Sequence, residues 1–420
     1  MQLDADWLTR QGEDATLLFA ADACWAGTRP PSVGVAVSGG GDSMALLHLF
    51  RRIAQQTGQV LRAVTVDHQL RDGSAQEAAQ VADWCDTLGV PHETLIWRVW
   101  DGQGNLQAEA RAARYRLIAD WAKFHGLDAV ALGHTADDIA ETFLMRLSRK
   151  AGLEGLAAMR ARFQRHEVQW VRPLWQQSRA DLRDYLRRND QDWVDDPSND
   201  DPRFDRVRAR KALEALAPLG IDTDTLVHTA FSLQIANAAL QQQMHAIASE
   251  EINEDRGDLL ISHSTPLPEE IRRRLLNRAF QWISAEPYPP RWSALIDLEV
   301  EVTAGQTRSL SGCLVTRQDT DWRICREFNA VRDTVGATQD VWDNRWQLTG
   351  PHAPDLQIRA LGESVNSCPN WRETGLPRAS LRASPAVFRG ETLIAAPLAG
   401  YNPDWSAKIV ASFTTYLLSH

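Results

Sequence analysis

Apolar residues in the first half of the chain alternate between short runs and helical stripes. Val33–Val37 is an apolar run of strand length, and a glycine-rich turn follows it. After that turn, apolar residues recur at the i, i+3, i+4 and i+7 spacing of a buried helix face, namely Leu46, Leu49, Phe50 and Ile53. The spacing therefore predicts a strand, a turn and a helix in succession.

The same alternation of strand and helix recurs along the chain. The predicted pairs are 63–66 with 74–88, 94–99 with 106–125, and 129–132 with 135–147, and a last strand is predicted at 168–171. Strands that alternate with helices of this length indicate βαβ units, which build a parallel sheet with helices on both faces. Ligands of such sheets bind at the carboxyl ends of the strands. We therefore expect an α/β domain whose functional residues follow its strands.

This pattern changes after residue 195. Pro197 and Pro202 lie in a polar stretch that ends one helical pattern, and a further helix is predicted from Arg206. We therefore predict that the α/β domain covers residues 1–215.

The remaining chain is expected to form two more domains. Long helical stripes over 222–250 and 268–283 predict a mainly helical middle domain, residues 216–335. Beyond it the helical period fades, and short apolar runs lie between prolines. Residues 336–420 are therefore expected to form a small α+β domain.

The composition argues against several classes of protein. The five cysteines lie far apart without a Cys-x-x-Cys pair, which argues against a zinc knuckle, a disulfide framework and a two-cysteine redox centre. No apolar run approaches the roughly 20 residues that span a bilayer, so no membrane partner is expected. The start of the chain, Met1–Asp14, is acidic, unlike the basic start of a signal peptide. The expected compartment is the cytoplasm.

Charge is distributed unevenly along the chain. The formal net charge is −10, which is unusual for a protein that binds nucleic acid. However, arginine dominates the stretches 160–188 and 206–211, and the local field is what attracts phosphates. A run of charge is more often a solvated face. Charge alone therefore leaves open both a nucleic-acid surface and an ordinary polar surface.

The turn after the first strand reads Ser38-Gly39-Gly40-Gly41-Asp42-Ser43. Its glycines let backbone approach a ligand closely, and the following helix offers its N-terminal amides to a phosphate. It is neither a Walker A loop, because no Lys-Ser/Thr pair follows at the required spacing, nor a G-x-G-x-x-G dinucleotide loop. A turn that only reverses the chain is the simpler alternative. The pattern resembles the pyrophosphate loop of the PP-loop ATPases, which implies that residues 38–43 bind ATP and that Asp42 helps to hold Mg²⁺.

Two further groups of polar residues are candidates for a ligand site, and the arginines among them suit an anionic ligand. Asp67 and His68 end the second predicted strand, at the edge where ligands of a parallel sheet bind. Arg111 and Arg114 share one face of a later helix. A strand-end turn and surface salt bridges are the commoner explanations of such residues. The segment from Asp67 to Arg71 nevertheless resembles the Asp-His-x-Leu-Arg segment of the tRNA(Ile)-lysidine synthetases.

A cluster of ionisable residues begins where the fourth predicted strand ends. His134 is followed by Asp137, Asp138 and Glu141, and apolar residues form the opposite stripe of the same helix. Carboxylates so placed could hold Mg²⁺ and the imidazole could stabilise a charged transition state, but a complement to the helix dipole is a cheaper explanation. Residues 134–142 match the lysidine-synthetase pattern His-x-x-Asp-Asp-x-x-Glu-Thr, which favours chemistry.

The same resemblance continues along the chain to residue 210. Further segments that match the family are Gly152–Leu156, Arg172-Pro173-Leu174, Asp195–Asn199, and Arg206 with Arg210. The departures from its usual residues are Val207 for Asn, Ile139 for Gln, and Lys150-Ala151 for Gly-Ser. The resemblance therefore covers residues 33–210 in unbroken order.

Similarity to the tRNA(Ile)-lysidine synthetases implies a fold and a reaction. The implied fold is α/β, with a parallel-sheet PP-loop domain of the adenine nucleotide α-hydrolase type, then a helical middle domain and a small α+β domain. In the implied reaction, ATP adenylates the wobble cytidine of the CAU anticodon of tRNA(Ile), and L-lysine then displaces AMP to give lysidine. ATP and Mg²⁺ are the implied cofactors, and a homodimer stays open.

The resemblance also implies roles for individual residues. Catalysis is implied for Asp42, Arg114, His134 and Asp137. Nucleotide binding is implied for residues 38–43, Asp67, His68 and Arg111. Magnesium binding is implied for Asp42, Asp137 and Asp138, and tRNA binding for Arg172, Arg206 and Arg210.

Other interpretations stay open. A second PP-loop enzyme that adenylates tRNA, such as a thiolase, generally needs paired catalytic cysteines, which this chain lacks. A nucleotide-sensing or RNA-binding protein would keep the loop without turnover, and tRNA-dependent exchange of pyrophosphate into ATP would separate it from an enzyme. A dehydrogenase-like fold is disfavoured because the dinucleotide fingerprint is missing.

Overall fold

The computed structural model describes residues 3–25, 27–70, 73–98, 106–157, 159–195, 203–262, 266–319 and 321–419. Arg71 and residues 196–199, which belong to family-like segments, lie outside the described residues. The chain divides into two units, Met1–Asn237 and Ala238–His420. Within the described residues, no helix combines the length and the apolar character needed to cross a membrane.

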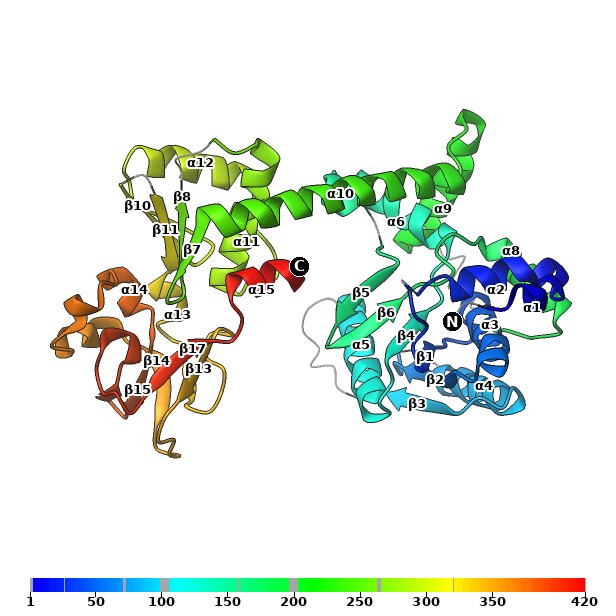
Figure 1. Ribbon diagram of the computed structural model, residues 1–420, viewed down its shortest axis with the longest axis horizontal. Helices are drawn as coiled ribbons and strands as arrows, with labels where there is room; N and C mark the ends of the chain where they lie inside the picture. Colours follow the sequence, from blue (N-terminus) through cyan, green and yellow to red (C-terminus); the bar gives the residue numbers. More distant parts are fainter. Residues whose placement is uncertain are drawn as a thin grey trace. The chain divides into compact units, whose positions relative to one another are not determined.

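A six-stranded sheet forms the centre of the first unit (Figure 1). In the order β3-β2-β1-β4-β6-β5, its strands are His92–Ile96, Val60–Asp67, Ser32–Ala36, Ala129–Leu132, Val168–Val171 and Arg162–Arg165. All neighbouring pairs are parallel except β6 and β5, which are antiparallel. The predicted parallel sheet is therefore confirmed. The edge strand β5 was not predicted because three of its four residues are polar and exposed, so it contains no apolar run.

Helices cover both faces of this sheet. The helices on one face are α2 (Ala15–Asp22), α3 (Gly41–Thr57), α4 (Ser74–Thr87) and α8 (Arg179–Arg188). The opposite face carries α5 (Leu106–Phe124), whose Tyr115 packs with Trp170 of β6. Because both faces are covered, every residue of β4 is buried, which explains why its sequence reads as a continuous apolar run.

The first unit contains further helices around α6 (Ala136–Ser148). They are α7 (Leu153–Leu156), α9 (Asp205–Leu216) and the first part of α10 (Thr223–Glu251), whereas α1 (Ala5–Thr9) packs beside α2. Ile139 and Phe143 of α6 share an apolar cluster with Leu226 and Ala230 of α10. The apolar stripe predicted for α6 is thereby accounted for.

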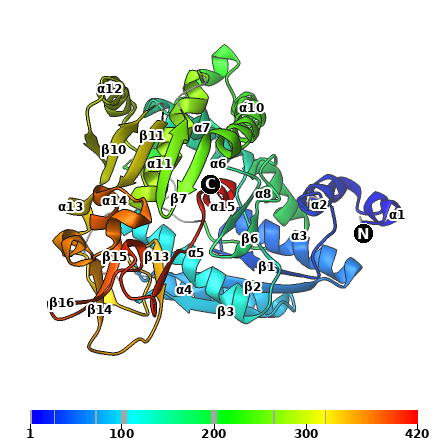
Figure 2. The ribbon, with the colours of Figure 1, turned by 60° about the vertical axis from the view of Figure 1, so that its left-hand side comes forward.

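The second unit contains a five-stranded antiparallel sheet that the sequence did not predict (Figure 2). In the order β7-β8-β11-β10-β9, its strands are Ile252–Asp255, Asp258–Ser262, Asp321–Arg326, Cys313–Gln318 and Arg308–Leu310. The helices α11 (Glu269–Ser284) and α12 (Trp292–Thr303) pack against it. The strands have three to six residues each, so their apolar residues are too few to stand out beside the long helical stripes.

Smaller elements complete the second unit. The strands β12 (Gly336–Ala337), β14 (Gln357–Ala360), β15 (Pro385–Arg389) and β16 (Thr392–Ala395) form a four-stranded sheet, and β13 (Trp346–Thr349) pairs with β17 (Ser406–Ile409). The short helices are α13 (Phe328–Val331), α14 (Arg378–Arg382) and α15 (Phe413–Ser419). This mixture agrees with the expected α+β character.

Buried polar contacts join the two domains expected within the second unit. Asp258, the first residue of β8, accepts hydrogen bonds from Arg323 (2.7 Å) and from Ser380 (2.5 Å). Arg345 donates a hydrogen bond of 2.7 Å to the carbonyl of Gly257, in the turn between β7 and β8. Apolar packing also crosses residue 335, because Phe413 and Leu417 join the cluster around the five-stranded sheet and Val331 joins the cluster of the last strands. The division at 215 and 335 into three domains stays a prediction.

Candidate active site

The glycine-rich loop joins β1 to α3. Gly40 is the N-cap of α3, and among the described residues no side chain caps this helix start. The Ser43 hydroxyl closes the loop, because it accepts a hydrogen bond from the Ser38 amide (3.1 Å) and donates one to the Gly40 carbonyl (2.9 Å). The first amides of a helix have no partner within it, so this uncapped start is suited to an anion.

Three close backbone contacts shape this loop. Gly39 has a φ of +86°, and a Cβ atom there would lie 3.0 Å from Val81. The Gly39 carbonyl accepts a hydrogen bond of 2.9 Å from the Val194 amide, beyond α8. A Cβ atom on Gly133 would lie 3.0 Å from the carbonyl oxygen of Asp42. Gly133 lets the end of β4 approach the loop, a role that the sequence analysis missed.

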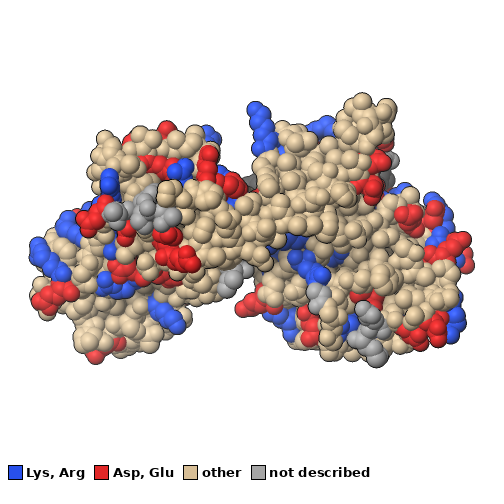
Figure 3. Space-filling model, turned by 45° about the horizontal axis from the view of Figure 1, so that its top comes forward, with Lys and Arg blue, Asp and Glu red and all other residues tan. Residues whose placement is uncertain are grey.

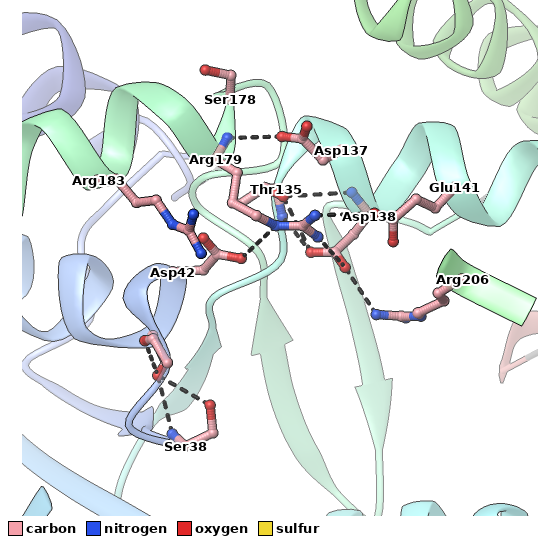
Figure 4. A network of polar contacts seen from close by, with 12 residues as sticks. Ser38, Asp42, Thr135, Asp137, Asp138, Glu141, Ser178, Arg179, Arg183 and Arg206 are labelled. Carbon is pink, nitrogen blue, oxygen red and sulfur yellow. Dashed lines mark hydrogen bonds and ion pairs between the residues drawn. The ribbon is translucent and has the colours of Figure 1, made fainter. Parts of the chain in front are cut away.

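Arg179 lies at the centre of the carboxylates that were assigned to magnesium and catalysis (Figure 4). Its guanidinium donates to carboxylates on two helices: Asp42 on α3 at 3.1 Å, and Asp138 at 3.3 Å and Glu141 at 3.0 Å on α6. Its backbone amide donates to Asp137 at 2.7 Å. The structure thus brings the predicted carboxylates together through an arginine that the sequence analysis counted only as part of a basic stretch.

Two more arginines face the same cluster. Arg206 donates to Asp138 at 2.9 Å, and Arg210 donates to Glu141 at 3.1 Å. Asp138 also accepts a hydrogen bond from the Thr135 amide and caps α6. These contacts cover two carboxylates of the acidic face of α6, because the side chains of Asp138 and Glu141 are only 7% and 2% exposed. Arg206 and Arg210, predicted to contact tRNA, pair with these carboxylates although their side chains are 46% and 36% exposed, and their contact with tRNA stays a prediction.

Burial and charge set the protonation of this cluster. Burial raises the pKa of Asp42 to about 6, and Asp138 adds to this increase although Arg179 opposes it. Burial would also raise the pKa of Asp138, but Arg206 and Arg179 outweigh it and lower that pKa. Burial would lower the pKa of Arg179, whereas its three carboxylates raise it. Because four carboxylates face three guanidinium groups, the cluster retains an excess of negative charge.

The carboxylate cluster contains the residues that were predicted to bind magnesium. Within the described ranges, no three side chains of His, Cys, Asp or Glu form a ready metal site. Arg179 occupies the space between Asp42 and Asp138. However, the Oε2 atom of Glu141 is buried and has no hydrogen-bond partner in the described part of the chain. Oxygen ligands and unbalanced negative charge suit Mg²⁺, and the assignment to Asp42, Asp137 and Asp138 stays a prediction.

The structure pairs His68 with Arg114. The guanidinium of Arg114 donates to Nε2 of His68 at 3.2 Å, so the ring proton is on Nδ1. That Nδ1 atom is buried without a partner among the described residues. Asp67 is also buried and accepts a hydrogen bond from the Gln69 amide. Arg111 lies on the neighbouring Tyr115 ring, with its guanidinium carbon 5.4 Å from the ring centre.

The structure also pairs His134 with Arg172. The Nε atom of Arg172 donates to Nδ1 of His134 at 3.2 Å. Arg172 is only 5% exposed, and it also donates to the carbonyl of Arg160. Arg172 was predicted to contact tRNA, but its burial does not present it to a large ligand. Its guanidinium is instead committed to contacts inside the protein.

Arginines of the two basic stretches fall into two classes. Those from Arg179 onwards are mostly paired with carboxylates, namely Arg179, Arg183, Arg187, Arg188, Arg206, Arg208 and Arg210. In the described structure, no carboxylate pairs with the exposed Arg160, Arg162 or Arg165, or with Arg111 of α5. Arg165 instead lies over the Tyr115 ring, 4.4 Å from its centre. On the face of the molecule that Figure 3 shows, acidic and basic side chains are interspersed.

Comparison with known proteins identifies the family. A family model described as a PP-loop domain matches residues 17–216. A tRNA(Ile)-lysidine synthase of Ruegeria pomeroyi is 46% identical, over 93% of this chain and 95% of that protein. The tRNA(Ile)-lysidine synthase of Wolbachia pipientis is 33% identical, over 76% of this chain and 76% of that protein. The tRNA(Ile)-lysidine synthase of Zymomonas mobilis is 38% identical, over 60% of this chain and 76% of that protein. The resemblance of the motifs is confirmed, and this chain belongs to the tRNA(Ile)-lysidine synthase family.

Proposed function

We propose that this protein uses ATP to join L-lysine to the wobble cytidine of the CAU anticodon of tRNA(Ile). The 2-carbonyl oxygen of cytidine attacks the α-phosphate of ATP and pyrophosphate leaves. The lysine amine then displaces AMP, which gives lysidine. The observation that carries the proposal is the uncapped start of α3, which lies beside His134 and the carboxylate cluster in a chain of this family.

The loop is proposed to hold the phosphates of ATP. An uncharged base carbonyl is a poor nucleophile, so it must be positioned against the α-phosphate while developing charge is neutralised. The amides of residues 38–43 supply donors without a formal charge. Arg114 and His134, which lie beside this edge of the sheet, would stabilise charge on the α-phosphate. His68, whose buried Nδ1–H has no partner among the described residues, would supply a further donor to the nucleotide.

Mg²⁺ is proposed to accompany ATP. Asp42 and Asp137 are the residues that would hold it, because Asp138 is already engaged by the cap of α6 and by two arginines. When bound, Mg²⁺ would neutralise charge on phosphate oxygens. The guanidinium of Arg179 now pairs with Asp42, so it would have to move aside.

The arginines without carboxylate partners are proposed to contact tRNA. Arg160, Arg162 and Arg165 are exposed on or beside the edge strand β5, and Arg111 shares the Tyr115 ring with Arg165. Phosphate contacts of this kind position RNA without reading its sequence. Discrimination between tRNAs would then rest on contacts elsewhere, for which the second unit is available. The homodimer and the cytoplasmic compartment stay predictions.

The reaction can be tested directly by mass analysis of tRNA nucleosides after incubation with ATP and labelled lysine. Lysidine should appear at the wobble position of the CAU-anticodon tRNA. Asp42→Ala and Asp137→Ala should abolish pyrophosphate release. The matched control is Asp184→Ala, because Asp184 is 60% exposed on α8 and pairs with the neighbouring Arg187. Equal pyrophosphate release by Asp42→Ala and Asp184→Ala would contradict the assigned role.

A further inference from the structure

The contact between Arg172 and His134 fixes where the imidazole carries its proton. A guanidinium can only donate hydrogen bonds, so the Nδ1 atom that faces Arg172 at 3.2 Å must present a lone pair. An imidazole with a lone pair on Nδ1 is uncharged and carries its single ring proton on Nε2. His134 is therefore a neutral donor, with Nε2–H pointing away from Arg172.

Arg172 is itself held firmly. Its Nη1 atom donates to the carbonyl of Arg160, and its guanidinium carbon lies 4.3 Å from the centre of the Phe163 ring. Its backbone amide donates to the Ala161 carbonyl at 2.8 Å. The guanidinium is thus anchored to β5 and the residues before it. An arginine held in this way can orient an imidazole with little loss of side-chain freedom on binding.

Charges around His134 favour the neutral ring. Its charged neighbours come from several elements and are Arg172 after β6, Asp138 on α6, Arg111 on α5 and Arg206 on α9. Burial and, after it, Arg172 lower the pKa of His134 to about 3, although Asp138 opposes this change. The imidazole therefore stays uncharged at physiological pH.

We propose that Arg172 is a positioning residue that holds His134 as the Nε2–H tautomer, so that this N–H is the donor offered to the α-phosphate of ATP. The inference rests on the proposed function and adds a specific atom to it. A fixed neutral donor can stabilise developing charge without binding the ground-state phosphate as strongly as a cation would. Arg172 thereby acts in adenylation through His134 and does not touch the tRNA.

The tautomer can be observed in the free protein. The full chain is labelled with ¹⁵N only in histidine, and the ring nitrogens are recorded by NMR across a pH range. The His134 signals are identified by their loss in His134→Gln. An unprotonated Nδ1 and a protonated Nε2 are expected from about pH 8 to about pH 5.5. Because this measurement needs neither ATP nor tRNA, it stays interpretable if the proposed reaction is wrong.

Variants of Arg172 test the consequence. In Arg172→Met, the pKa of His134 should rise towards its ordinary value, because the adjacent cation is gone. The kcat of ATP–pyrophosphate exchange should fall roughly 10²-fold, which is typical for one preorganised donor, with little change in KM for ATP. Arg172→Lys can still donate to Nδ1 and should recover part of the rate. Arg187→Met is the matched control, because Arg187 is 61% exposed on α8 and pairs with Asp184.

Several outcomes would overturn the proposal. One is a wild-type His134 that carries its proton on Nδ1, or on both nitrogens, at neutral pH. Another is an Arg172→Met protein whose His134 signals and exchange rate match those of the wild type. If Arg172→Met does not fold, the wild-type spectrum and the exchange rate of Arg172→Lys still decide the question.

Discussion

Removing Arg179 should destabilise the first unit, because three carboxylates depend on its guanidinium. Asp42 has no other hydrogen-bond partner among the described residues, whereas Asp138 and Glu141 each keep a second arginine. The side chains of Arg179 and Asp42 are both 22% exposed, so the loss falls on a pair that is mostly buried. The effect of Arg179→Ala should therefore be concentrated at Asp42.

The size of this effect follows from the burial of the pair. Removing one partner of a buried ion pair lowers the free energy of unfolding by about 3–5 kcal/mol. Because this pair is partly exposed, we expect a loss of about 3 kcal/mol. For a unit of this size, each kcal/mol lowers the unfolding midpoint by roughly 2–4 °C. Arg179→Ala should therefore lower the midpoint of the first unit by roughly 6–12 °C.

Differential scanning calorimetry of the full chain would measure the loss, with Arg187→Ala as the matched control. Arg187 lies on the same helix α8, is 61% exposed and pairs with Asp184, so its removal should cost less than about 0.5 kcal/mol. Added Mg²⁺ should stabilise Arg179→Ala more than the wild type, because the substitution leaves the space between the carboxylates open to the ion. Equal midpoints for the two variants would refute the role of Arg179.

The destabilisation by Arg179→Ala should also depend on pH. The pKa of Asp42 in the folded chain, about 6, lies above its ordinary value of 3.8. Ionisation of this carboxyl therefore lowers the stability of the fold as the pH rises from 3.8 to about 6, and the full cost is present above about 6. The cost fades as the pH falls and the carboxyl is protonated. Removing Arg179 raises this pKa further, so the loss should be larger at about pH 8 than at about pH 5. If Arg179→Ala lowers stability equally at both pH values, the destabilisation comes from lost packing and not from the charge of Asp42.

Two further predictions concern other parts of the chain. Gly257→Ala should destabilise the second unit by about 3 kcal/mol, because φ is +94° and the new Cβ would meet Trp346 at 2.4 Å. The control is Gly305→Ala, where φ is +86° and the space is open, so that its loss should be only about 1 kcal/mol. Thermal unfolding measures both losses. Arg111→Ala should reduce the slope of log tRNA affinity against log salt by about 0.7–0.9, whereas Arg187→Ala, which removes a paired arginine, should leave that slope unchanged in a filter-binding titration.

The sequence was informative where one local pattern determined one local structure. Ala129–Leu132 and Val168–Val171 have the bounds that were predicted for them, because strands buried on both faces are continuous apolar runs. The start of α3 at Gly41 was likewise indicated by the glycine-rich turn at residues 38–43. The five-stranded sheet of the second unit was missed because its strands are short and derive their pairing from distant partners.

Contacts between distant residues could not be predicted in this way. Asp42 and Arg179 are separated by 137 residues, and nothing in either neighbourhood specifies that they meet. Arg172 resembled any other arginine of its stretch, although its place directly after an apolar strand was a sign of burial. Exposure decides whether an arginine is a surface charge or an internal ligand. That property belongs to the tertiary structure.

The hydrogen bond from Val194 to the Gly39 carbonyl bears on the order of events during synthesis. A nascent chain that ends at residue 150 already contains the whole Ser38–Ser43 motif and four strands of the sheet. It lacks Val194, which closes over the loop, and Arg179, which neutralises Asp42. The nucleotide site can therefore mature only after α8 and the residues behind it have left the ribosome. Until then, the exposed carboxylates of α6 and the open loop depend on solvent and ions.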